Sequence, residues 1–242
     1  MYSLMYFFLI FFVYSIIGYI IEVTSCIIIS KKFTISRGYL LGPYIPVFGI
    51  GALLMVTLLD KYKNDIIVLF ILSAFLCSAV EYFVSLLMEM IFKLRWWDYS
   101  KDKFNINGRI CLRNAFLFGI GGVAIVKYFN PVFTSFLSSF SEMTIIIVGW
   151  IFASIIIIDT IVSTFIISKL HINTKKYLNQ DATDVIKEQV ADSLRKYRIF
   201  YRRLFRAYPH IKFNANIIKL REFMDEQLGK TIRLVKIKDK RR

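Results

Sequence analysis

Charged residues, cysteines and histidines are all scarce in this sequence of 242 residues, and each scarcity excludes a class of protein. Only 20% of the residues are charged against 57% that are hydrophobic, which is not the surface composition of a soluble domain of this length. The three cysteines (Cys26, Cys77 and Cys111) are odd in number and widely spaced within or beside apolar runs, so we expect neither a disulfide framework nor a metal cluster. The composition therefore favours a membrane protein.

Motifs for catalysis and for nucleotide binding are also missing. The sequence has no GxSxG and no HExxH motif, and both histidines, His171 and His210, lie in its C-terminal part. The string GKT at 229–231 resembles the end of a phosphate-binding loop, but Met224 stands where that loop needs a glycine. We therefore expect no metal and no cofactor, and an enzyme built on this chain would need a glutamate as base and an arginine as anion clamp.

Long apolar runs dominate the first 168 residues. The first has no Lys or Arg before Lys31 and is longer than a signal-peptide core, so we expect it to be retained as a membrane span. Crossing the roughly 30 Å of hydrocarbon takes about 20 such residues. The string PVFTSFLSS, after the fourth run, favours a short interfacial helix. The five predicted spans are 4–29, 41–59, 66–92, 111–129 and 143–168.

The connections between the spans differ in positive charge, which predicts an orientation. The first and third connections and the C-terminal tail hold 29 Lys and Arg, whereas the second and fourth connections hold 3. By the positive-inside rule the N-terminus is outside and the tail is in the cytoplasm. The fold class predicted is therefore all-α: a polytopic helix bundle in the cell membrane, with about five spans.

The chain divides in composition near residue 168. Residues 169–242 hold 20 Lys and Arg against 8 Asp and Glu, and apolar residues recur on one helical face between 186 and 208. This predicts a cytoplasmic tail of basic amphipathic helices that bind anionic lipid headgroups or a protein partner, and not nucleic acid. Within the transmembrane domain (1–168), FGIG at 48–51 and again at 118–121 suggests a two-span repeat of 1–60 and 66–130.

Ionisable residues inside the spans are the candidate functional groups, because a charge in the bilayer centre normally pairs with or binds something. Glu22 shares a face with small polar residues of the first span, and Glu81 and Glu89 share one in the third, a pattern typical of helices that pack on one another. Two interpretations remain open: ion pairs between these glutamates and Arg37 or Arg109, or a polar pocket for a charged or lipid-headgroup ligand. The predicted site is Glu22, Glu81, Glu89, Arg37, Arg95, Trp96, Trp97, Asp98, Asn105, Asn107 and Arg109.

The loop between the third and fourth spans carries most of that site. Trp96 and Trp97 are typical of an aromatic belt at the membrane interface, but adjacent side chains point apart, so we expect one of them to pack inward. Asn105 and Asn107 favour either capping of the next helix or contact with a ligand. Gly108 permits a tight turn or a close backbone approach.

Several strings in this region resemble a known family. RGYLLGPYIPVFGIG, the glutamates at 22, 81 and 89, and RWWDYSKDKFNINGRICL followed by FGIGG are similar to the bacterial integral-membrane family labelled Putative ABC-transporter type IV, or CmpB-like. The resemblance covers roughly residues 5–170. It implies a multi-span protein of permease type, with no established substrate.

These observations leave three candidate functions to be tested. The first is a permease-like component that works with a separate ATPase subunit, because the chain has no phosphate-binding loop, and that forms a homo-oligomer, because five spans are few for a pore. The second is a membrane-embedded enzyme that acts on lipid headgroups or lipid phosphates with glutamate and arginine. The third is a scaffold whose basic tail recruits partners.

Overall fold

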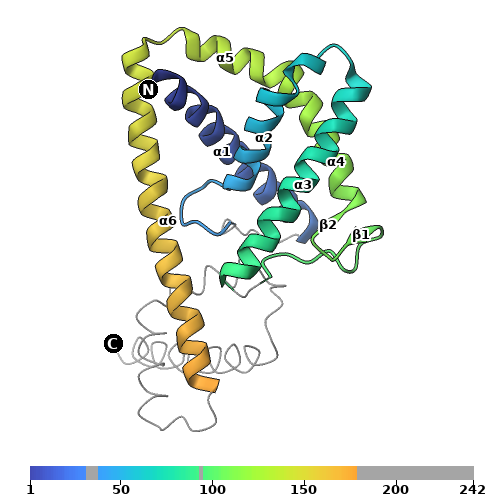
Figure 1. Cartoon of the computed structure of the whole chain (residues 1–242), viewed down its shortest axis with the longest axis vertical. Coiled ribbons are helices and arrows are strands. Elements are labelled where there is room, and N and C mark those ends of the chain that lie inside the picture. The colour runs from blue at the N-terminus through green and yellow to red at the C-terminus, as the bar shows by residue number, and fades with distance from the viewer. Residues whose placement is uncertain (31–37, 93–94, 179–242) are drawn as a thin grey trace, which may run out of the picture.

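The computed structural model describes residues 1–30, 38–92 and 95–178, and helices make up most of them. Predictions for the tail beyond Leu178, including its amphipathic helices, lie outside the described residues, as does Arg37. In chain order the elements are α1 (Tyr2–Ser30), α2 (Pro46–Leu58), η1 (Asp60–Tyr62), α3 (Ile66–Phe92), β1 (Asn105–Ile106), β2 (Ile110–Cys111), α4 (Leu112–Ala124), η2 (Ile125–Phe129), α5 (Asn130–Ser138) and α6 (Glu142–Leu178) (Figure 1).

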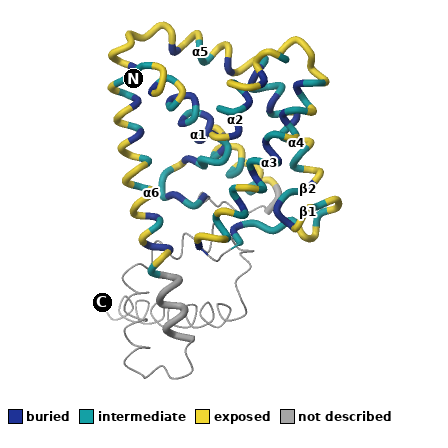
Figure 2. The backbone as a smooth tube through the Cα atoms, viewed as in Figure 1, coloured by how far each residue is buried: buried dark blue, intermediate teal, exposed yellow. Residues whose placement is uncertain are grey.

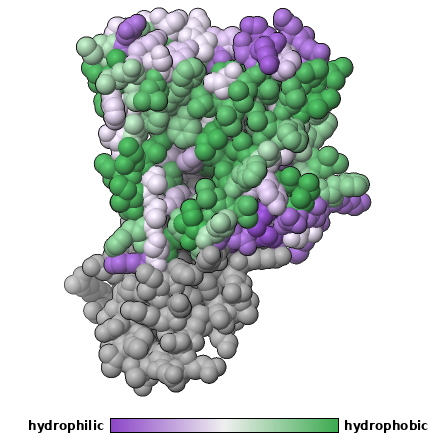
Figure 3. Space-filling view, in the orientation of Figure 1, coloured by the Kyte–Doolittle hydropathy of each residue, from purple (hydrophilic) through white to green (hydrophobic). Residues whose placement is uncertain are grey.

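Among the residues that the structure describes, four helical segments are long and apolar enough to cross a membrane. Large hydrophobic side chains such as Phe75, Phe83 and Ile158 point outward, more than 60% exposed, as lipid-facing residues do. Figure 3 shows the result as an apolar band between more polar ends. The four segments are Tyr2–Ile28, Ile66–Phe92, Leu112–Ser138 and Glu142–Lys169.

The second predicted span differs from the expectation. Its helix, α2, has 13 residues, and at 1.5 Å per residue it covers about 20 Å, too little to cross the hydrocarbon alone. Pro46 stands in the first turn of the helix, where the missing N–H has no helical partner to lose, so it begins the helix and does not kink it. Residues before Pro46 are unwound, so the segment consists of an extended stretch followed by a short helix.

The fourth predicted span is a helix that changes character midway. A π-helical turn, η2, follows α4, and α5 follows directly with Pro131 in its first turn. Figure 1 shows α5 running across the end of the bundle toward the start of α6. PVFTSFLSS is therefore helical and lies across an end of the bundle, as an interfacial helix would.

The C-terminal end of α3 and the β1–β2 hairpin lie toward the end of the bundle where α6 extends furthest, while the N-terminus and α5 lie at the opposite end (Figure 1). Between them, residues of α1, α2, α3, η2, α5 and α6 form the main hydrophobic core, which includes Ile10, Leu69 and Val126 (Figure 2). Helix α6 passes without a break through the boundary predicted at 168. The all-α prediction needs one addition, because β1 and β2 form a small antiparallel hairpin.

The two helical hairpins α1–α2 and α3–α4 have a common plan. In each, a long helix is followed by a helix of 13 residues. A side chain on Gly49 would meet Phe11 and Ser15 of α1, and one on Gly119 would meet Phe70 of α3. These glycines are equivalent in the two FGIG strings, and each lets its short helix approach the preceding long one. The duplication itself remains a prediction.

Candidate functional site

The buried face of α3 is unusually polar for a membrane-length helix. Apart from Leu69, Cys77 and Phe92, its buried residues are Ser73, Ser78, Glu81 and Ser85. Each polar atom taken into an apolar interior needs a hydrogen-bond partner, or it costs roughly 1–3 kcal/mol. The partners of this stripe therefore determine whether it serves packing or binding.

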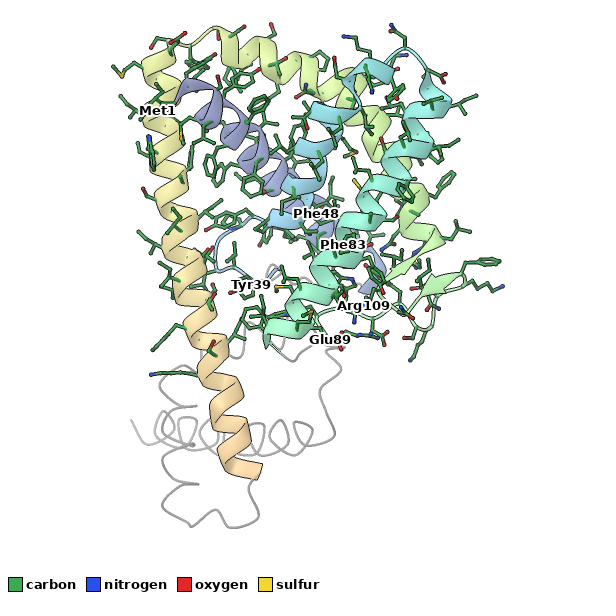
Figure 4. All side chains as sticks on the ribbon, viewed as in Figure 1. Met1, Tyr39, Phe48, Phe83, Glu89 and Arg109 are labelled. Carbon is green, nitrogen blue, oxygen red and sulfur yellow. The ribbon has the colours of Figure 1, made fainter. Side chains whose placement is uncertain are left out.

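At the loop end of α3, an ion pair joins the helix to the hairpin. The Arg109 side chain is 10% exposed, and its Nη2 lies 2.8 Å from Glu89 Oε2. Its Nη1 donates to Ser85 Oγ at 3.2 Å, and its guanidinium lies over the ring of Tyr82, with 5.7 Å between Cζ and the ring centroid. Figure 4 shows Glu89 and Arg109 side by side at this end of the helix. The interpretation of a glutamate paired with Arg109 thus holds for Glu89.

Arg95 extends the same network. Its Nε lies 3.4 Å from Glu89 Oε2, and its Nη1 lies 3.5 Å from Asp98 Oδ1. Gly108 has a φ of +65°, and a Cβ there would approach Asp98 Oδ1 to 2.5 Å and Arg95 Nη1 to 3.2 Å. Glycine is therefore required at this position twice, once for its backbone conformation and once for space.

The predicted capping role of the two asparagines is wrong. Cys111 stands at the N-cap of α4, with no side-chain hydrogen bond there. Asn107 and Gly108, both with positive φ, are the central residues of a β-turn in the loop of the β1–β2 hairpin, which Arg109 N closes by donating to Ile106 O at 2.9 Å. Asn105 Oδ1 accepts from Gly108 N at 3.0 Å inside the same loop. The Asn-Gly dipeptide is the usual signal of such a hairpin, and the sequence reasoning overlooked it.

The tryptophan pair packs into the protein. Trp96 is 3% exposed and makes edge contacts with Tyr39 and Phe92, which confirms the expectation that one ring turns inward. Trp97 is half-buried, and its Nε1 donates to the carbonyl oxygen of Arg109 at 3.1 Å. The pair therefore ties the loop after α3 to the bundle.

Glu81 lies deeper in the bundle and is bound less completely. Tyr99, which sequence reasoning did not single out, reaches from the loop and donates to Glu81 Oε1 at 3.0 Å. Glu81 is 8% exposed, and its Oε2 is buried without a hydrogen-bond partner. Glu22 of α1 and Asn114 of α4 approach the same carboxyl group. Burial, followed by the negative charge of Glu81, raises the pKa of Tyr99, so its hydroxyl stays protonated as a donor.

A second carboxylate, the half-buried Asp159, holds the unwound segment before α2. Its oxygens accept hydrogen bonds from Leu41 N at 2.9 Å and Gly42 N at 2.7 Å. Tyr44 OH and Ser163 Oγ also donate to it, at 2.5 Å and 2.9 Å. Non-helical backbone at membrane depth needs such partners, because lipid offers none. We call this arrangement the Asp159 clasp.

The predicted site residues fall into three groups. Glu89, Arg95, Asp98 and Arg109 form one ionic network, while Asn105, Asn107 and the tryptophans shape the loop that carries it. Glu81 and Glu22 lie together next to Tyr99, on the membrane side of that network. The expectation that the polar faces of α1 and α3 pack on one another needs correction, because Ser15 and Gly18 of α1 pack on Gly49 and Phe48 of α2.

The chemistry available here favours binding over catalysis. Arg109 and Arg95 are engaged by carboxylates, so neither is free to hold a phosphate. Within the described ranges, no group of three or more His, Cys, Asp or Glu side chains is placed to hold a metal ion. The least satisfied group is the Glu81 carboxylate, whose chemistry is that of a ligand for a proton or a cation.

Comparison with known families agrees with this arrangement. The family model described as Putative ABC-transporter type IV matches residues 9–164, from the first half of α1 to the apolar part of α6. No curated protein and no solved structure matches the chain significantly. Because the match covers well over half of the chain, including every element of the bundle, the protein belongs to the Putative ABC-transporter type IV family.

Proposed function

We propose that the protein is a permease-like membrane component of a transport system, with a polar site at the loop end of its bundle. The observation that carries the proposal is the family match, which spans both the apolar helices and the loop residues of the ionic network. In this proposal the N-terminus is outside the cell, and the site at Glu81, Glu89 and Arg109 opens toward the cytoplasm, as the distribution of Lys and Arg favours.

The loop after α3 has the geometry of a cover for that site. Tyr99 N donates to Gly108 O at 2.8 Å, and the Arg109–Glu89 pair fastens the hairpin to α3. Tyr99 projects from this braced loop to Glu81. A movement of the loop would therefore expose the carboxylate without disturbing the rest of the helix.

The energy source and the assembly are parts of the same proposal. An ATPase subunit supplies the nucleotide site, because the chain carries no phosphate-binding loop. A homo-oligomer supplies enough helices to surround a path. The basic tail, with 20 Lys and Arg, binds anionic headgroups on the cytoplasmic leaflet.

Purification of the full-length, affinity-tagged protein from its native membranes tests this function. We expect a nucleotide-binding subunit to co-purify in mild detergent and the eluate to hydrolyse ATP. Gly108→Ala, which distorts the cover, should lower the recovered ATPase activity, whereas Gly121→Ala should not, because a Cβ at Gly121 meets open space. Recovery of folded protein with no nucleotide-binding subunit would contradict the proposal.

The enzyme alternative has less support from the contacts. A lipid-phosphate enzyme needs an arginine that is free to hold the phosphate, and the described arginines of the site bind Glu89 or Asp98 instead. The scaffold alternative depends on the tail beyond Leu178. Deletion of residues 179–242 distinguishes it, because a scaffold loses all partner recovery while a permease retains its ATPase.

A further inference from the structure

Polar oxygen atoms without partners gather along the interior of α3. Ser73 Oγ, Ser78 Oγ and Glu81 Oε2 are all buried with no hydrogen-bond partner. Ser78 and Glu81 are each 8% exposed, and their i, i+3 spacing places them on one face of the helix. Serines in an apolar helix normally return their hydroxyl to the backbone, as Thr160 does in α6. The α3 serines do not, so their oxygens stay available to a ligand.

The charge of Glu81 is not balanced by the nearby arginines. Arg109 is engaged by Glu89 and Ser85, and Arg95 by Glu89 and Asp98. No described Lys or Arg forms an ion pair with Glu81. Its neighbours are Tyr99 from the loop and Asn114 from α4, two neutral side chains that offer it hydrogen bonds, and Glu22 from α1, which adds negative charge.

We propose that Glu81 Oε2 and Ser78 Oγ bind a small monovalent cation in the interior of the bundle, beneath Tyr99. The ligands are all oxygen atoms, which suits sodium, potassium or the ammonium group of an organic substrate. The inference deepens the proposed function, on which it rests for the use made of the cation, because it names the ligand of the inner site.

A single charge fits this site better than two. Divalent metals in proteins take several carboxylates or waters, and the described residues hold no such group of ligands. Anions are excluded because the site already carries negative charge. The cation would enter from the loop end of the bundle, because the Tyr99 side chain, which comes from the loop, covers Glu81 on that side.

Thermal unfolding of the purified full-length protein tests the binding without any transport assay. The protein is titrated with sodium, potassium or methylammonium chloride against choline chloride at constant ionic strength and pH. We expect at least one of the three to raise the Tm by several degrees at saturation. Response to a metal ion identifies a free ion as ligand, and response to methylammonium alone identifies a substrate ammonium group.

Variants locate the site. Glu81→Gln should abolish the shift, Glu81→Asp should retain it at lower affinity, and Ser78→Ala should weaken the affinity about tenfold, the loss of one oxygen ligand. Glu142→Gln and Ser154→Ala, exposed residues of α6, are the matched controls and should respond as the wild type does. If Glu81→Gln fails to fold, Glu81→Asp and Ser78→Ala carry the test.

Three results would overturn the inference. They are the absence of any cation-specific shift, a shift that persists unchanged in Glu81→Gln or Ser78→Ala, and a Tm that depends on pH alone, which would assign Glu81 to a proton. None of them decides the proposed function, because recovery of the ATPase subunit is measured independently.

Discussion

Asp159 and Glu81 are both carboxylates in apolar helices, yet they differ in how completely their oxygens are hydrogen-bonded. Asp159 accepts four hydrogen bonds, two of them from backbone N–H groups, and both of its oxygens have partners. Glu81 has Tyr99 and Asn114 as polar neighbours, and its Oε2 has no hydrogen-bond partner within the described residues. A carboxylate at the bilayer centre costs about 3 kcal/mol on insertion scales, and satisfied partners offset that cost. This difference indicates that Asp159, whose oxygens are fully hydrogen-bonded, stabilises the fold. Glu81, which has an oxygen without a partner, is the candidate for binding a ligand.

The Asp159 clasp also shows what a structural acid does. Residues 38–45 are not helical, and Asp159 supplies the acceptors that their N–H groups lack. The neighbouring contact between Tyr39 OH and Thr164 Oγ1, together with Ile45 N donating to Ser15 O at 2.9 Å, fixes the same segment to α6 and α1. The start of α2 is thus set by contacts from both sides.

Asp159→Asn should give the largest loss of stability. The amide has one acceptor oxygen, so its NH2 group would face either the donors of Leu41 and Ser163 or the donors of Gly42 and Tyr44. With one part-buried N–H group and one hydroxyl losing their acceptor at roughly 1–3 kcal/mol each, we expect a loss of about 3 kcal/mol. Denaturant or thermal unfolding in detergent measures it.

The matched control makes the same chemical change in an exposed place. Asp65 Oδ1 accepts from Val68 N at 3.0 Å at the start of α3, where asparagine caps almost as well. Asp65→Asn should therefore change stability by less than about 0.5 kcal/mol. Equal losses of stability in Asp159→Asn and Asp65→Asn would show that the Asp159 clasp stabilises the protein no more than an exposed helix cap does.

Arg109→Met should rank second. It leaves Glu89 with only the longer contact to Arg95 and removes the donor to Ser85. Breaking a buried pair costs about 3–5 kcal/mol, but Glu89 is 37% exposed, so we expect about 2 kcal/mol. Arg113→Met breaks the pair with Asp102, in which Arg113 is 64% exposed, and should cost under about 1 kcal/mol. A comparable loss in both variants would contradict the buried role of Arg109.

The main outline of the fold was predictable because it depends on local pattern. Long apolar runs mark α1, α3 and α6, since crossing lipid requires length and hydrophobicity that any window of the sequence displays. The run 41–59 was wrongly predicted to be a full membrane span, because hydropathy does not distinguish a helix from an unwound segment held by other helices. Gly42, Pro43 and Pro46 were the signals of that break.

The site was predictable in membership but not in pairing. Helical spacing placed Glu81 and Glu89 on one face, and the charges of the following loop identified Arg95 and Arg109. The sequence pattern could not show that Glu89 forms ion pairs with both Arg95 and Arg109. Ser163 lies four residues from Asp159 on the same helix, but the other three partners lie 115 to 118 residues away along the chain, a distance over which one sequence holds no pairing information.

Tyr99→Phe should have a smaller effect, because it removes a single hydrogen bond, the one that Glu81 Oε1 accepts from the tyrosine hydroxyl. We expect a loss of about 1–2 kcal/mol, the usual range for a hydrogen bond to a charged group or one within a membrane bundle. The stability should be measured at neutral pH and again at high pH, because the two measurements report different properties of Tyr99.

The pH dependence follows from the raised pKa of Tyr99. The folded protein holds this proton more tightly than the unfolded chain, whose tyrosine titrates near 10.0. The stability that Tyr99 contributes is therefore complete below that pH and declines as the pH rises above it. Tyr99→Phe should fall less steeply with rising pH than the wild type, and parallel curves would contradict the buried position of the hydroxyl.

Glu81→Gln should have the smallest effect and the opposite sign to Asp159→Asn. The amide oxygen still accepts from Tyr99, and the change removes a buried negative charge that no described Lys or Arg balances. In choline chloride, with no small cation present, we expect the variant to match or exceed the wild type by up to about 1 kcal/mol. Added sodium, potassium or methylammonium should then reverse the order, because only the wild type gains stability from binding. A large loss in choline chloride would instead make Glu81 a structural acid like Asp159, with partners that the unbound state already supplies.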